Sequence, residues 1–78
     1  MKTWGIVYND NKITIEDRSN IVKLMVNGEV VDTSKGLFTL AILNCHLQSG
    51  EIITAVVGVG SWKTKCVIII NGKKVYEN

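Results

Sequence analysis

Two cysteines and one histidine are the residues of this chain that could do metal or thiol chemistry: Cys45, His46 and Cys66. A zinc site needs several converging ligands, and a thiol enzyme needs a cysteine beside a base. Cys45 and His46 are consecutive, so on a strand they point to opposite faces. The sequence has no C-x-x-C pair and no second histidine. These residues therefore argue against both a metal site and cysteine catalysis.

The acidic residues and the glycine-rich stretch predict no active site either. Seven Asp and Glu residues are scattered over expected turns and outer faces, whereas catalytic carboxylates must converge in a cleft. After the stretch Gly58-Val59-Gly60, neither a helix start nor a Lys-Ser/Thr pair follows at the spacing that a phosphate-binding loop requires. We therefore expect a protein that is not an enzyme and that holds no cofactor.

Length and composition predict one domain over residues 1–78. Hydrophobic residues make up 46% of the chain and charged residues 21%, which excludes a disordered segment. The net charge of +2 is too mild to imply nucleic acid by itself. No apolar run is long enough to span a membrane. The start lacks the apolar core of a signal peptide, so we expect reduced cysteines and a cytoplasmic protein.

Two Asn-Gly dipeptides, Asn27-Gly28 and Asn71-Gly72, each lie inside an apolar run. Asn-Gly between strand-like residues is the strongest local signal for a β-hairpin, because a type I′ turn needs positive φ at both central positions. Aligning the two turns also aligns their arms. Val22, Leu24, Val26 and Val31 then correspond to Cys66, Ile68, Ile70 and Val75. The chain thus contains two related hairpins.

Short alternating runs between polar turns predict the remaining strands. We expect strands over 3–8, 13–16, 21–26, 29–32, 37–47, 52–57, 63–70 and 73–76. The stretch 37–47 fits both helical and strand spacing, and we favour a strand because turns bound it on both sides. Together the pattern predicts an all-β fold, a single small antiparallel β-sandwich or flattened barrel of about eight short strands.

A two-residue hairpin loop sets the register, and the register sets the faces. It predicts that Ile68 lies opposite Val75, that Val67 lies opposite Tyr76, and that Lys23 pairs with Asp32. One face of each hairpin should then be core. The expected core residues are Val22, Leu24, Val26 and Val31 in the first hairpin, and Cys66, Ile68, Ile70 and Val75 in the second. The other face of each hairpin is half apolar.

These half-apolar faces lead to two functional hypotheses. The first is a non-enzymatic interaction module that binds a protein partner or a second copy of itself through Met25, Val30, Ile69 and Tyr76, or through a free sheet edge. The alternative is binding of single-stranded nucleic acid by the basic C-terminal hairpin. Its candidate residues are Trp62, Lys63, Lys65 and Lys74.

Four stretches carry a resemblance to known proteins. They are residues 11–17 (NKITIED), 23–32 (KLMVNGEVVD), 49–53 (SGEII) and 66–73 (CVIIINGK). They resemble a set of small uncharacterised bacterial all-β proteins and, more remotely, the β-sandwich repeats of Fas apoptotic inhibitory molecule. The chain departs from that second family before the first hairpin, where Arg18-Ser19-Asn20-Ile21 stands. The resemblance implies a compact β domain with a non-enzymatic role.

Overall fold

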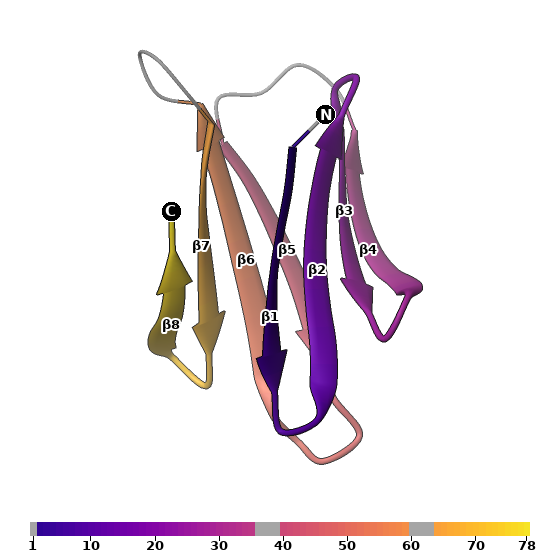
Figure 1. Ribbon diagram of the computed structural model, residues 1–78, viewed down its shortest axis with the longest axis vertical. Helices are drawn as coiled ribbons and strands as arrows, with labels where there is room; N and C mark the ends of the chain where they lie inside the picture. The colour runs from indigo at the N-terminus through magenta and orange to yellow at the C-terminus, as the bar shows by residue number, and fades with distance from the viewer. Residues whose placement is uncertain (1, 36–39, 60–63) are drawn as a thin grey trace.

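The computed structural model describes residues 2–35, 40–59 and 64–78, which form eight antiparallel β-strands (Figure 1). The strands are β1 (Lys2–Tyr8), β2 (Asn11–Arg18), β3 (Ile21–Val26), β4 (Glu29–Lys35), β5 (Leu40–His46), β6 (Ile52–Val59), β7 (Thr64–Ile70) and β8 (Lys73–Glu77). No described residue lies in a helix, so this part of the chain offers no helix that could cross a membrane.

The strands form two four-stranded sheets. The first sheet has the order β1-β2-β3-β4 and the second has the order β5-β6-β7-β8. Strands of both sheets run along the long axis of the molecule (Figure 1). The prediction of an all-β antiparallel fold is confirmed. Because the sheets are separate and share a core, the fold is a sandwich rather than a flattened barrel.

The core consists of the inward-facing residues of both sheets, as the alternation of a half-buried strand requires. It contains Trp4, Ile13, Ile15, Val22, Leu24, Ala41, Leu43, Ile53, Ala55, Val57, Cys66, Ile68 and Ile70. No described polar or charged residue is fully buried. Most of the stabilisation of this small fold therefore comes from apolar burial between the two sheets.

The two Asn-Gly turns have the predicted geometry. Asn27 and Asn71 have φ of 53° and 52°, and the following glycines have φ of 84° and 78°. Each asparagine also binds the neighbouring strand. In the first hairpin, Asn27 Oδ1 accepts from the Lys12 N–H and the Asn27 N–H donates to the Lys12 carbonyl, both at 2.8 Å. Asn71 makes the same two bonds to Ile52, both at 2.9 Å.

A β-bulge in each hairpin overturns part of the predicted register. The pairs next to the turns are as expected, but Leu24 lies opposite Asp32 and Ile68 lies opposite Tyr76. The predicted Lys23–Asp32 pair is therefore wrong, and so are the predicted partners of Ile68 and Val67. The extra residues, Val31 and Val75, leave the core face and are 37% and 38% exposed.

The second arm of each hairpin therefore shifts by one residue. Five of the expected core residues are buried as predicted: Val22, Leu24, Cys66, Ile68 and Ile70. Val26 is only partly buried, and it packs against the core from the turn end. Since a one-residue slip moves a side chain to the other face, the prediction of faces failed at each bulge and beyond it.

Several strands are longer than the sequence predicted. The first sheet is joined by tight two-residue turns, Asn9-Asp10 and Ser19-Asn20, in which all four residues have positive φ. The polar residues beside these turns, and residues 33–35, belong to strands rather than to loops. Over 40–46 the ambiguous stretch 37–47 is a strand, as favoured. Residues 37–39 and 63, expected in strands, and 60–61, expected in a turn, lie outside the described residues.

Candidate functional site

The two cysteines and the histidine do not form a reactive or metal-binding group. Cys66 is fully buried on the core face, and burial raises the pKa of its thiol to about 11. Burial, followed by the charge of Asp32, also raises the pKa of Cys45. Since the thiolate is the nucleophile, neither cysteine is activated. No group of three potential metal-ligating residues occurs among the described residues.

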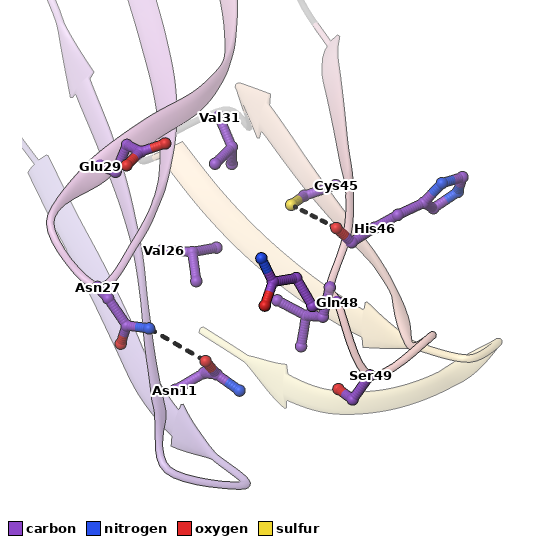
Figure 2. A pocket seen from close by; sticks show the side chains of 10 residues that line it. Asn11, Val26, Asn27, Glu29, Val31, Cys45, His46, Gln48 and Ser49 are labelled. Carbon is purple, nitrogen blue, oxygen red and sulfur yellow. Dashed lines mark hydrogen bonds between the residues drawn. The ribbon is translucent and has the colours of Figure 1, made fainter.

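A cleft of about 550 Å³ lies between the first Asn-Gly turn and the turn that joins β5 to β6 (Figure 2). Its lining residues are Asn11, Val26, Asn27, Glu29, Val31, Cys45, His46, Leu47, Gln48 and Ser49. The Cys45 thiol donates to the His46 carbonyl at 3.6 Å. Figure 2 shows the His46 ring pointing away from this thiol, as expected for consecutive strand residues. The cleft therefore holds no cysteine–histidine pair.

Three polar residues in the wall of this cleft, Asn11, Asn27 and Ser49, make side-chain hydrogen bonds at the turns. Asn27 binds Lys12 through its Oδ1 and donates from its Nδ2 to Asn11 Oδ1 at 3.0 Å. On the opposite side, the Ser49 hydroxyl donates to Glu51, which also accepts from Asn9 Nδ2 at 3.1 Å. These contacts link the turns at this end of the sandwich. The cleft therefore lies where hydrogen bonds between turns stabilise the fold.

The four residues of the interaction hypothesis do not form one surface. Met25 and Val30 pair across β3 and β4 on the outer face of the first sheet. Ile69 occupies the equivalent position on the outer face of the second sheet, where it pairs with Lys74. Tyr76 shares the face of Ile68 because of the bulge, and it packs against the core. The structure thus brings together only the first two.

A different apolar surface lies on the second sheet. Ile42, Val56 and Val67 are consecutive cross-strand partners on its outer face, and we name these three the apolar row. On β8 the row ends at Glu77, the partner of Val67. Ile42 is 56% exposed, and Leu40 beside it is 55% exposed. The equivalent positions on the outer face of the first sheet form the polar row, which consists of Thr3, Glu16, Lys23 and Thr33. The two rows are equivalent because Lys23 and Val67 stand four residues before their Asn-Gly turns.

Sequence reasoning overlooked the apolar row although a signal for it was present. Leu40 and Ile42 alternate with Ala41 and Leu43. This period of two predicts that the first pair shares one face. What the sequence left open was which face is core. In the structure Ala41 and Leu43 are buried, and Leu40 and Ile42 point outward.

One of the lysines of the basic C-terminal hairpin is paired with an acid. Lys74 Nζ lies 2.7 Å from a carboxylate oxygen of Glu77. The hydrogen bond and the charge of Lys74, with a smaller contribution from Lys65, hold the pKa of Glu77 below its usual value. Tyr76, the aromatic residue of this hairpin, packs against the core. Trp62 and Lys63 lie outside the described residues.

Comparisons with known proteins give no indication of function, so the functional argument rests on the geometry. No protein-family model matches the chain, and no curated protein or solved structure is significantly similar to it.

Proposed function

We propose that this protein is a non-enzymatic interaction module that binds another protein through the outer face of the β5–β8 sheet. The observation that carries the proposal is the apolar row together with Leu40. The solvent-exposed face of an antiparallel sheet normally carries polar residues, as the polar row does. An apolar patch on a small domain is typical of a binding surface.

Charge at the rim of this face favours one kind of partner. Lys65 pairs with Gly58, and Lys74 pairs with Ile69, so both lysines border the apolar row. Glu77 offsets one of the two positive charges. The partner surface that complements this face has an apolar centre and an acidic rim. Two free cysteines support a reducing compartment, which we propose is the cytoplasm.

A photocrosslinking amino acid at position 42 tests this function. We expect it to trap a discrete partner in lysate of the source cells. Excess wild-type protein and the Thr33→Lys variant should compete with the trapping, whereas Ile42→Lys should not. Thr33 is the matched control because it lies in the polar row and is also exposed. Circular dichroism checks that both variants fold. If Ile42→Lys competes as well as the wild type, the outer face of the second sheet is not the binding surface.

Binding of single-stranded nucleic acid remains the second candidate, because Lys65 and Lys74 lie on the same outer face. A labelled thymidine oligonucleotide at low salt tests it by fluorescence anisotropy. Binding by phosphate contacts must weaken steeply as salt rises. The Glu77 carboxylate among these lysines works against such contacts, so we expect no binding. A salt-sensitive complex that is lost in Lys65→Ala with Lys74→Ala would replace the first proposal with this one.

A further inference from the structure

The two sheets have four edge strands, and three of these are protected against pairing with another chain. An edge strand presents unpaired N–H and C=O groups, which proteins block with bulges, charges or covering groups. β4 and β8 each carry a bulge, at Val31 and Val75. β8 adds the charged residues Lys73, Lys74 and Glu77. On β5, the Asn44 N–H is already taken by Asp32 Oδ2, at 2.9 Å.

Among the described residues, nothing gives the fourth edge strand, β1, a bulge or a side chain bonded to its free edge. All seven of its residues pair with β2 without a register shift. Its only charged residue is Lys2, at one end. Val7, at the other end, is 74% exposed, the highest value among the large apolar residues that the structure describes. A shallow hollow of about 410 Å³ at this strand is lined by Gly5, Ile6, Val7 and Lys12.

The turn after β1 determines which backbone groups face the free edge. In a two-residue hairpin, the residues on either side of the turn form a hydrogen-bonded pair, and such pairs alternate along the strands. Tyr8 and Asn11 are that first pair. The next residue back, Val7, and then Gly5 and Thr3, therefore direct their N–H and C=O groups away from β2. These three residues are all exposed.

We propose that β1 pairs antiparallel with β1 of a second copy of this chain, with the two-fold axis at Gly5. In this register Gly5 lies opposite its own counterpart, and Thr3 lies opposite Val7 of the other copy. The pairing joins the first sheets of two molecules into one eight-stranded sheet. A glycine at the centre favours it, because a strand glycine permits close approach of another backbone.

A second copy fits this edge better than a chain of unrelated sequence, for reasons of charge and side-chain character. The antiparallel arrangement places Lys2 opposite Tyr8 of the other copy, so the lysines do not face each other. Trp4 lies opposite Ile6, which joins apolar residues on the inner face. On the outer face, Val7 gains Thr3 as a neighbour and becomes covered. Every cross-strand pair is thus compatible with symmetric pairing.

Disulfide trapping tests this register. The double variant Thr3→Cys with Val7→Cys should oxidise to a covalent dimer, since Cα atoms of a hydrogen-bonded pair lie about 5.5 Å apart, within disulfide range. Within one chain the two positions lie about 13 Å apart along a strand and cannot bridge. Either single variant should remain monomeric under denaturing conditions. The wild type gives the background from Cys45 and Cys66. Equal crosslinking in the single and double variants would contradict the register.

Light scattering of the wild type tests the association itself. We expect the mass to rise from 8.6 kDa toward twice that value across an about hundred-fold range of protein concentration. Amide exchange at Thr3, Gly5 and Val7 should slow over the same range. The Val7→Lys variant should stay monomeric, and the matched Ile42→Lys variant should dimerise like the wild type. A monomer at all concentrations would overturn the proposal and leave the proposed partner surface intact. Loss of the dimer in Ile42→Lys alone would assign the contact to the second sheet instead.

Discussion

The polar row of the first sheet and the apolar row of the second sheet occupy the same place in two sheets of the same strand order. Glu16 and Lys23 stand side by side in the first, and Val56 and Val67 stand side by side in the second. The buried residues of the two inner faces show no such contrast, since all those that the structure describes are apolar. The burial of apolar surface on folding explains why the inner residues of both sheets are apolar. It does not explain why one outer face is apolar, which is why we assign binding to that face.

The largest effect should come from truncating equivalent inner residues. Leu24 and Ile68 stand three residues before Asn27 and Asn71, and both are completely buried. Leu24→Ala and Ile68→Ala should each lower the free energy of unfolding by about 2–5 kcal/mol. Urea denaturation measures this. Ile42→Ala on the outer face should change it by less than about 0.5 kcal/mol. A large loss at Ile42 would mean that the outer face is part of the core.

The glycines of the two Asn-Gly turns should give the next largest effect. A Cβ at Gly28 or Gly72 meets no atom within 4 Å, so the cost of Gly→Val is chiefly backbone strain. Because both φ values are near 80°, each variant should lose more than about 1 kcal/mol, by similar amounts. Chemical denaturation of both variants checks this. Unchanged stability in either would show that its turn does not need positive φ.

Substitution of the asparagines in the same turns should affect the two hairpins to different extents. Asn27→Gly and Asn71→Gly keep positive φ accessible but remove the Oδ1 acceptor of a backbone N–H. Each should cost about 1 kcal/mol in the free energy of unfolding. The loss should be larger at Asn27, whose Nδ2 also donates to Asn11. An Asn11→Ala background provides the control, because there the two asparagines should become equal. A larger loss at Asn71 would contradict the contacts described.

The smallest effect concerns the acid that ends the apolar row. The pKa of Glu77 is lowered chiefly by the hydrogen bond from Lys74. A carboxyl whose pKa is lower in the folded state stabilises the fold above its unfolded pKa, and this stabilisation is lost as pH falls through the folded value. Wild type should therefore be slightly more stable than Glu77→Gln at neutral pH and equal to it in acid. A difference that persists in acid would exclude the ion pair as its cause.

The sequence predicted the fold class because its strongest signals are local. The Asn-Gly turns depend only on residues that are neighbours in the chain. The same is true of the period of two that places Val22 and Leu24, or Cys66 and Ile68, on one face. The bulges lack such a signal, since Val31 and Val75 continue the apolar pattern of their strands. Only the three-dimensional arrangement shows that each is the unpaired extra residue.

The candidate surface was harder to predict than the fold. Met25 and Ile69 were correctly placed on outer faces, but nothing in the sequence showed that these faces belong to different sheets. The apolar character of Ile42 and Val56 is equally compatible with a core position. A binding surface made of strand-forming apolar residues leaves no signature of its own, because the core uses the same residue types.

The strand order has a consequence for how fast the protein folds. Every hydrogen-bonded strand pair joins strands that are consecutive in the chain, without a crossover between the sheets. Four of the six connections within the sheets are two-residue turns, after β1, β2, β3 and β7. Little loop-closure entropy is lost before these contacts form. Since folding rate rises as contact order falls, this sandwich should fold faster than β-sandwiches whose strands pair across long crossover connections.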